Sequence, residues 1–516
     1  MTSVSRDATT LWETFERTVL VDPDAPALST PDETVTRGQL AEQASELAAA
    51  LRAAGVREHG LGLLMLPSSV AFVAAFLALT RLPATAALVS TRFRESELRA
   101  IAATVRPDFV LVLPRDAAEA AAQLDVESAH DLTLPGSGQT LRLLRLRATA
   151  PSVLDVPERF GLRDAGSYPT LVKFSSGSTG VPKAVLWTAA NVCAAAANVV
   201  ETFGLDASDV VLAPVPLAHS YGFDLGVLPV AFAGTSLAIR RRPSWKAILA
   251  ELADGRVSVF LGVPAVYHLL NRTRLDPAPD LSATRYLLSC TAPLPVDVAE
   301  AFSQRFHASI CQHYGSSETG GISLCHPSES AQQPDSVGRA MPGVELSIVG
   351  PHGETLPAGS RGEVVIGGAA TAAGYIRGAT ERDAGVGFRD GRYWTGDIGS
   401  LDADGFLRLD RTRPGVVHVG GWKVSLAEVA RVLESHPLVR ESAVADVEDA
   451  RGMARIVAAV TLQGPVEGAT VEEATLMEFC RARLADYKQP RRVYIVEELP
   501  RTANGEIVWS AGHPPA

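Results

Sequence analysis

Short apolar stretches alternate with longer helical stretches through the first four hundred residues of this chain. The segments "LGLLMLP" (61–67) and "VSVFLGVP" (257–264) are almost entirely apolar, as expected of strands that are buried on both faces. Between such strands lie Ala-, Leu- and Glu-rich stretches, of which "TRGQLAEQASELAAALRAAGV" (36–56) is the clearest. The alternation predicts an α/β fold in which helices cover largely parallel sheets.

The stretch 36–56 carries both helix start and helix stop signals. Thr36 and Gln39 have the spacing of a capping box, and Gly55 is placed to end the helix. Four apolar residues recur on one helical face: Leu40, Ala44, Leu47 and Leu51. We therefore expect a helix that packs this face against a sheet.

The sequence pattern changes twice in the last third of the chain. Between about 340 and 410, Gly-rich alternating segments such as "RGEVVIGG" predict a β-rich region, expected to be a small β-barrel. After Arg411, "TRPG" predicts a linker, and Ser425 and Glu428 cap a helix that runs to about Glu434. Strands near 441–446, 455–462 and 491–496 and a helix near 472–485 follow. We predict a large N-terminal domain (1–411) and a small α+β C-terminal domain (412–516).

Length and charge restrict the classes of function. The 516 residues exceed one ordinary hydrophobic core, and the net charge of −11 argues against non-specific nucleic-acid binding. The five cysteines form no C-x-x-C pair, so neither a disulfide framework nor a zinc site is expected. The polar N-terminus lacks a signal sequence, and the apolar runs are too short to span a membrane. A cytoplasmic protein without a membrane partner is expected.

The segment "KFSSGSTGVPKAV" (173–185) places a hydroxyl- and glycine-rich loop directly after an apolar strand. Backbone N–H groups, hydroxyls and a following cation, Lys183, are what a polyphosphate needs. The loop does not have the Walker A spacing. A flexible surface loop is the alternative that composition alone leaves open. The candidate phosphate ligands are Ser176, Gly177, Ser178, Thr179 and Gly180.

Three further segments combine turn residues with chemically active side chains. "PVPLAHSYGFDLG" (214–226) contains His219, "QHYGSSETGG" (312–321) contains Glu318, and "YWTGDIG" (393–399) contains Asp397. Each segment alone is compatible with a structural turn. In this order and together with the phosphate loop, they resemble the adenylate-forming superfamily of acyl-CoA synthetases, peptide-synthetase adenylation domains and luciferases. The resemblance extends from about residue 10 to 508.

That resemblance implies a fold, a reaction and cofactors. In the family a carboxylic acid and Mg-ATP give an acyl-adenylate and pyrophosphate; the small C-terminal domain then rotates, and a thiol such as that of coenzyme A displaces AMP. The implied nucleotide residues are Tyr314 and Gly315 at the adenine, Asp397 and Arg411 at the ribose, Ser317 at the α-phosphate, and Ala292 nearby. Glu318 would bind Mg²⁺. His219 would separate the acyl pocket from the nucleotide.

The resemblance also implies an acyl pocket and a thiol channel. The acyl pocket would be lined by Tyr221, Gly262, Val263, Pro264, Tyr267, Cys290 and Thr291, whose small and apolar character predicts a hydrophobic acid. Ser220 stands where peptide-synthetase domains have an Asp, which disfavours an amino acid. In "HVGGWKVSLAEV" (418–429), Gly420 and Gly421 would let the pantetheine arm pass. Trp422 would flank this channel or, alternatively, pack within the domain.

One departure from the family pattern stands near the C-terminus. The family ends in "LP-[RK]-T-x-x-G-K", where the lysine bridges the carboxylate and the α-phosphate during adenylation; this chain reads "LPRTANGE", with Glu506 in the lysine position. A cation there stabilises a transition state that joins two anions, whereas attack by a thiol on a finished adenylate has no such need. Glu506 is therefore expected to impair adenylation far more than thioester formation.

Three hypotheses for the function follow. The preferred one is an enzyme that transfers an acyl group from a preformed acyl-adenylate, supplied by a separate adenylating enzyme, to coenzyme A; Lys183, Glu318 and Mg²⁺ would then be partly vestigial. The second is a complete acid–CoA ligase in which another cation, such as Lys488, replaces the lysine. The third is a non-catalytic protein that binds adenylates. A carrier protein is the alternative acceptor of the acyl group.

Overall fold

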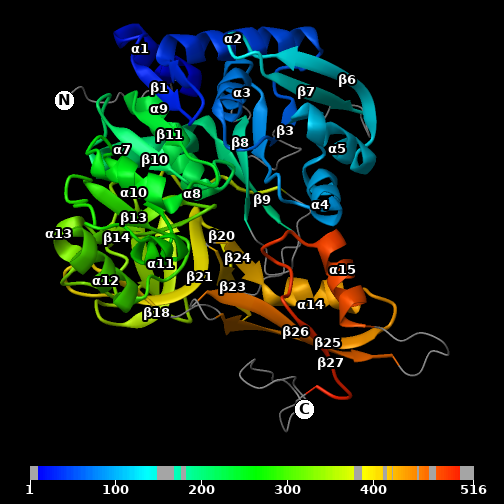
Figure 1. The fold of residues 1–516 in the computed structure, drawn as a ribbon, viewed down its shortest axis with the longest axis vertical. Helices are drawn as coiled ribbons and strands as arrows, with labels where there is room; N and C mark the ends of the chain where they lie inside the picture. Colours follow the sequence, from blue (N-terminus) through cyan, green and yellow to red (C-terminus); the bar gives the residue numbers. More distant parts are fainter. Residues whose placement is uncertain are drawn as a thin grey trace. The chain divides into compact units, whose positions relative to one another are not determined.

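The computed structural model describes residues 10–147, 168–175, 182–376, 386–410, 415–420, 422–449, 453–463 and 472–499 (Figure 1). These residues form two compact units. The first holds the described residues of 10–91, 104–175 and 184–410, and the second combines residues 92–103 and 182–183 with the described residues from 415 onward. The chain is a mixed α/β protein, as the alternation of strands and helices predicts.

Two large sheets form the body of the first unit. The eight-stranded sheet has the order β19 (Gly374–Tyr375), β9 (Lys183–Thr188), β8 (Pro169–Ser175), β4 (Thr85–Leu88), β3 (Leu61–Met65), β5 (Phe109–Val112), β7 (Thr140–Leu146) and β6 (Val126–Thr133). The nine-stranded sheet has the order β16 (Arg339–Ala340), β15 (Gly320–Leu324), β14 (Ile310–Ser316), β13 (Tyr286–Ser289), β12 (Val259–Gly262), β10 (Val210–Ala213), β11 (Ser236–Ile239), β1 (Pro26–Ser29) and β2 (Thr34–Thr36).

Parallel pairing dominates the centre of both sheets. In the nine-stranded sheet β10, β12, β13 and β14 run parallel to their neighbours in this group, with Val259 opposite Tyr286 and Leu287 opposite Ile310. Every residue of β12 is buried, because the strand is covered on both faces. The carboxyl ends of these four strands therefore lie along one edge of the sheet.

Helices of the first unit cover the sheets. They are α1 (Leu11–Val21), α2 (Arg37–Ala53), α3 (Val70–Arg81), α5 (Ala117–Gln123), α7 (Ala189–Phe203), α8 (Ser220–Gly222), α9 (Leu228–Ala233), α10 (Trp245–Ala253), α11 (Pro264–Arg272), α12 (Val296–Phe306) and α13 (Pro327–Ser330), with the short turns η1 (Pro114–Asp116) and η2 (Phe223–Val227). Helix α7 contacts both β8 and β15, which belong to different sheets. No helix within the described ranges is long and apolar enough to cross a lipid bilayer.

Helix α2 begins and ends as its sequence predicts. Thr36 is its N-cap, and the Thr36 hydroxyl and the Gln39 side chain form both bonds of the capping box. The predicted apolar face is buried, with Leu40, Ala44, Leu47 and Leu51 all at most 1% exposed. Helix α2 lies beside α3 (Figure 1), whose residues from Val70 to Thr80 are all buried.

A third sheet of the first unit is antiparallel and has the central order β17 (Glu345–Val349), β18 (Arg361–Gly367), β21 (Arg392–Leu401) and β20 (Gly387–Arg389). Its fifth strand, β22 (Leu407–Leu409), pairs with β21. Ile348, Val364, Ile366 and Leu407 pack together on one face with Ile322 of β15. The sequence predicts this β-rich region, and the described strands form an open sheet of five.

The second unit has its own hydrophobic core. It contains the hairpin β23 (Val416–Val419) and β24 (Trp422–Ser425), helices α14 (Leu426–Glu434) and α15 (Glu473–Arg483), and the sheet β25 (Val439–Glu448), β26 (Ala454–Leu462) and β27 (Val493–Ile495). Ser425 caps α14 by accepting a hydrogen bond from the Glu428 amide. Most of helix α4 (Glu95–Val105) also belongs to this unit, although its sequence interrupts the first.

A buried cluster of three charges lies within the second unit. The Lys488 ammonium donates to Glu97 Oε1 at 2.6 Å and to Glu428 Oε1 at 2.7 Å, and all three side chains are at most 7% exposed. Burial lowers the pKa of Lys488, but the carboxylates of Glu428 and Glu97 outweigh it and hold that pKa above its ordinary value. Lys488 is therefore a charged structural partner of two carboxylates.

Replacement of Lys488 by methionine should weaken the second unit by about 3–5 kcal/mol, because two buried carboxylates would face each other without a cation. Hydrogen exchange of the backbone amides of β25 and β26 measures this loss. Arg481→Met removes an exposed ion pair with Glu478 and should leave the exchange unchanged. Equal protection in the two variants would contradict the stabilising role of Lys488.

Candidate active site

The turn between β14 and β15 presents the residues expected at the phosphates. Its backbone needs glycine at two points: Gly320 has a φ of +68°, and a Cβ at Gly315 would lie 2.7 Å from the Gly320 carbonyl oxygen. The Ser316 hydroxyl accepts from the Glu318 amide at 3.2 Å and bonds to the Thr319 hydroxyl at 2.9 Å. These contacts fix the turn, so that Ser317 and Glu318 are held in defined positions.

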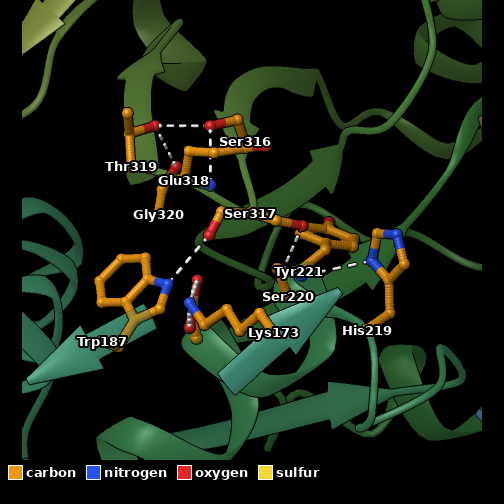
Figure 2. Close-up of polar contacts among 11 residues, drawn as sticks. Lys173, Trp187, His219, Ser220, Tyr221, Ser316, Ser317, Glu318, Thr319 and Gly320 are labelled. Carbon is orange, nitrogen blue, oxygen red and sulfur yellow. Dashed lines mark hydrogen bonds and ion pairs between the residues drawn. The ribbon is translucent and has the colours of Figure 1, made fainter. Parts of the chain in front are cut away.

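Ser317 is held from two sides. The Trp187 indole N–H donates to the Ser317 carbonyl oxygen at 3.0 Å, and the hydroxyls of Ser317 and Ser220 are 2.9 Å apart (Figure 2). Trp187 comes from β9 and Ser220 from the turn that follows β10. The residue expected at the α-phosphate is thus joined to two separate elements of the first unit.

Asp397 and Tyr314, which are expected at the ribose and at the adenine, lie together. The Tyr314 hydroxyl donates to Asp397 Oδ2 at 2.7 Å. Burial, and then the Asp397 charge, raise the pKa of Tyr314 well above its ordinary value, so the phenol keeps its proton. The Asp397 amide donates to the Thr395 hydroxyl at 3.0 Å. Besides the bond from Tyr314, the Asp397 carboxylate can accept further hydrogen bonds, as two ribose hydroxyls would require.

Glu318 is a buried carboxylate, 4% exposed, that accepts a hydrogen bond from the Tyr375 hydroxyl at 2.9 Å. Tyr375 in turn lies 3.5 Å from the Tyr393 hydroxyl. Within the described residues, no group of three or more His, Cys, Asp or Glu side chains is placed to bind a metal ion. A single carboxylate still fits Mg²⁺, because this ion usually takes its other ligands from phosphates and water.

His219 begins the short helix α8, where its Nδ1 accepts from the Tyr221 amide at 3.4 Å (Figure 2). The turn is tight, since a Cβ at Gly222 would lie 2.4 Å from the Pro216 carbonyl oxygen. The Tyr221 hydroxyl donates to the Gly262 carbonyl oxygen at 3.1 Å. The segment expected to separate acyl group and nucleotide is thereby attached to the end of β12.

Several residues expected in the acyl pocket lie close together. A Cβ at Gly262 would lie 2.6 Å from the Tyr267 ring, whose hydroxyl donates to the Leu288 carbonyl oxygen at 2.6 Å. Burial raises the pKa of Tyr221 well above its ordinary value, so this phenol keeps its proton. Thr291 has a φ of +75°, an unusual conformation for a β-branched residue. Val263 and Pro264 start helix α11, and Ala292 follows Thr291.

The remaining predicted site residues fall into two groups. Lys183 begins β9 and is 8% exposed. Gly420 has a φ of +58°, and the Trp422 ring stacks on Tyr487 at 4.6 Å within the second unit, which agrees with the packing alternative for Trp422. Eight predicted site residues lie outside the described residues: Ser176, Gly177, Ser178, Thr179, Gly180 and Arg411, expected at the nucleotide, Gly421, expected at the thiol channel, and Glu506 at the lysine position.

Sequence reasoning did not identify a buried ion pair beneath this site. Lys173 Nζ lies 2.7 and 2.8 Å from the two carboxylate oxygens of Asp224, and both residues are 2% exposed. Burial lowers the pKa of Lys173 and raises that of Asp224, and each charge opposes the shift of the other. In the sequence, this ion pair is indicated by one charged residue inside each of two apolar runs, "TLVKFS" and "YGFDLGVLP".

His313 is buried directly before Tyr314. Its Nδ1 lies 3.0 Å from the Ser323 carbonyl oxygen, which can only accept, so Nδ1 carries a proton. Burial lowers the pKa of His313 to about 4, and this one hydrogen bond opposes the shift only in part. The imidazole is therefore neutral in the folded chain at neutral pH.

Comparison with known proteins places most of the chain in two family models. Residues 15–376 match the AMP-binding enzyme model, and residues 428–506 match the model of the AMP-binding enzyme C-terminal domain. An oxalate–CoA ligase of Arabidopsis thaliana is 30% identical over 512 residues, which cover 97% of each protein.

Solved structures agree with this match. An amide bond synthetase from Marinactinospora thermotolerans has a TM-score of 0.80 at 26% identity, covering 96% of this chain and 97% of that one. A malonyl-CoA ligase in a ternary product complex with methylmalonyl-CoA and AMP has a TM-score of 0.72 at 26% identity, covering 93% and 97%.

Tyr314→Phe should weaken AMP binding about tenfold, because the Asp397 carboxylate loses the donor that holds it in place. Isothermal titration with AMP measures the change in Kd. Tyr168→Phe, in a ring that stacks on His59 and takes no part in this site, serves as the control. An AMP affinity in Tyr314→Phe equal to that of the control would show that the hydroxyl does not position Asp397.

His313 should make the first unit less stable in acid. Its folded pKa lies below the ordinary value of 6.5, so its contribution is complete above about pH 6.5 and is lost as the pH falls toward 4. Between about pH 7.5 and pH 5 the loss should be about 2 kcal/mol. Denaturant unfolding of the wild type and of His313→Gln at both pH values isolates this term, and an equal pH dependence would refute it.

Proposed function

This chain belongs to the AMP-binding enzyme family, in its acyl-CoA ligase branch, and we propose that it catalyses mainly the second half-reaction of that branch. It takes a preformed acyl-adenylate and transfers the acyl group to coenzyme A, giving acyl-CoA and AMP. A separate adenylating enzyme supplies the substrate. The acyl group is that of a hydrophobic acid, in keeping with the apolar residues near Tyr221 and Tyr267.

The observation that carries this proposal is Glu506. The family model of the C-terminal domain matches this chain up to residue 506, and "LPRTANGE" keeps every fixed position of the family pattern except the lysine. At about 4 Å and an effective dielectric near 20, a cation beside an anion contributes about 4 kcal/mol. Loss of that contribution slows adenylation roughly a thousandfold, and a carboxylate adds repulsion.

The described residues support binding of a finished adenylate. Asp397, held by Tyr314, accepts the ribose hydroxyls, and the Ser317 hydroxyl donates to the α-phosphate. The thiolate sulfur of coenzyme A attacks the acyl carbonyl carbon, the carbon–oxygen bond to the phosphate breaks, and AMP leaves with the electron pair. The thiol proton passes to solvent. The leaving phosphate is already anionic and stable, so this step needs no lysine.

Glu318 is the residue that would hold Mg²⁺ if Mg-ATP binds, with Tyr375 orienting its carboxylate. The ion would neutralise phosphate charge, a contribution that matters for adenylation rather than for thiolysis. In thiolysis Glu318 keeps a structural role, since its backbone amide bonds to Ser316 within the turn between β14 and β15 and its carboxylate accepts from Tyr375 of β19.

The alternative of a complete ligase needs another cation. Lys488 is a poor candidate, because its ammonium already contacts Glu97 and Glu428 and is almost fully buried. The alternative of a non-catalytic adenylate-binding protein is less favoured, because such a protein has no need for the "HVGGWKVS" segment expected at the thiol channel.

Two incubations distinguish the alternatives, using matched pairs of hydrophobic acids and their synthetic adenylates. One contains acid, Mg-ATP and coenzyme A, and the other contains premade adenylate and coenzyme A. Mass spectrometry should detect thioester in the second and at least a thousandfold less in the first. Glu506→Lys should raise the yield from free acid selectively.

Glu506→Gln is the matched control, since it removes the negative charge without adding a cation. It should recover only part of the adenylation that Glu506→Lys restores. Comparable thioester from free acid and from adenylate in the wild-type protein would overturn the proposal. Absence of thioester in both incubations, with AMP still bound, would favour the non-catalytic alternative.

A further inference from the structure

Two buried charges in the first unit have no role in the reaction proposed above. Lys173 lies on β8, three residues before Ser176, where the expected phosphate loop begins, and Asp224 lies in the turn η2. Both are 2% exposed, and no solvent competes for their contact. The turn η2 is π-helical, a conformation that is often found at functional sites.

The Lys173 ammonium is held by more than its counter-ion. Besides the two bonds to Asp224, its Nζ lies 3.7 Å from the centroid of the Trp187 ring. Such a cation–π contact is strong when it is shielded from water, and Trp187 is fully buried. The ammonium therefore fixes the indole ring as well as the carboxylate.

The contacts continue from Trp187 and close into a ring. The indole N–H donates to the Ser317 carbonyl oxygen at 3.0 Å, and the Ser317 hydroxyl bonds to Ser220 at 2.9 Å. Ser220 leads through one helical turn, α8 and the start of η2, back to Asp224. We call Lys173, Trp187, Ser317, Ser220 and Asp224 the positioning ring. Figure 2 shows Lys173, Trp187 and Ser220 below the turn that holds Ser317 and Glu318.

The ring also touches the turn at Gly320. A Cβ there would lie 3.5 Å from the Trp187 ring and 3.7 Å from Asp224 Oδ2. The pair and the indole therefore form the surface on which the turn between β14 and β15 rests. A shift of either charge would reach Ser317 both through the Trp187 bond and through the backbone of the turn.

Stability alone does not require a buried ion pair. Apolar side chains of similar volume in place of both partners often leave stability unchanged or raise it. A charged pair adds a fixed geometry. An ammonium that makes two short hydrogen bonds and one ring contact can occupy only one position. That property matters where a neighbouring group must be placed accurately.

We propose that Lys173 and Asp224 are positioning residues that hold the Ser317 hydroxyl, through Trp187, in a fixed position relative to the segment of His219. The hydroxyl then meets the α-phosphate while His219, adjacent to Ser220 in the chain, stays beside the acyl carbonyl. The assignment of Ser317 to the phosphate rests on the proposed function. The contacts of the ring do not.

The test uses a double variant, Lys173→Met with Asp224→Leu, which removes both charges and leaves no carboxylate unpaired. AMP should bind about tenfold more weakly, and kcat for thiolysis of a synthetic acyl-adenylate should fall by at least tenfold. The KM for coenzyme A should stay the same, because none of the five ring residues is among those expected at the thiol channel. The melting temperature should change little.

Trp187→Phe provides a second, independent measurement. It keeps an aromatic face for the Lys173 ammonium and removes only the N–H that holds Ser317, so AMP affinity should fall three- to tenfold. Arg240→Met with Glu251→Leu is the matched control, since it removes a partly buried ion pair of the same unit at 2.6 Å. The control should retain wild-type AMP affinity and kcat.

Each outcome decides the matter. Wild-type AMP affinity and kcat in a folded double variant, or in Trp187→Phe if the double variant does not fold, would overturn the positioning role. Equal losses of AMP affinity and kcat in the control variant would show that the effect comes from a general loss of stability. Comparable thioester formation from free acid and from adenylate by the wild-type protein would contradict the proposed function and leave the ring intact, because AMP binding is measured directly.

Discussion

The common direction of four neighbouring strands determines where this chain can have a site. Strands β10, β12, β13 and β14 are neighbours that run in one direction, so the segments after their carboxyl ends must meet at one edge of the sheet. The segment of His219 follows β10, Val263 follows β12, Cys290 follows β13, and Ser317 begins the turn after β14. Residues that are a hundred positions apart in the chain become neighbours without any specific attraction between them.

Hydrogen bonds then fix the positions of the segments that the parallel strands bring to this edge. Tyr221 reaches across to the end of β12 through the Gly262 carbonyl oxygen, and Ser220 bonds to Ser317. Both bonds join the segment of His219 to its neighbours. The Tyr221 bond leads toward the expected acyl pocket, and the Ser220 bond leads toward the expected phosphate position. A displacement of α8 would therefore disturb both halves of the site at once, which suits an enzyme whose two substrates must meet at one carbonyl.

Local signals in the sequence predicted the elements well. The capping box at Thr36, the apolar face of α2 and the cap of α14 at Ser425 all depend on residues within one turn of each other, and the structure contains all three. The fold class follows from the same local signals through the alternation of strands and helices. The motifs around Ser317 and Asp397 could be placed because their chemistry and spacing match a family.

Long-range partners could not be predicted in this way. Lys173 interrupts an apolar strand visibly, but nothing local indicates that its counter-ion is Asp224, 51 residues away. Tyr314 was expected to cover the adenine, and its hydroxyl bond to Asp397 adds a contact that ring stacking does not imply. Periodicity reports which face of an element is buried. It does not report which of many distant side chains lies against that face.

The membership of residues 92–103 in the second unit has a consequence for biosynthesis. Glu97 leaves the ribosome 391 residues before Lys488, the cation that it contacts. At about 5–20 residues per second, tens of seconds pass between the two. During that interval the Glu97 carboxylate of helix α4 lacks the Lys488 ammonium that it contacts in the folded chain. The buried cluster of Glu97, Glu428 and Lys488 can therefore form only after the synthesis of the chain has passed Lys488.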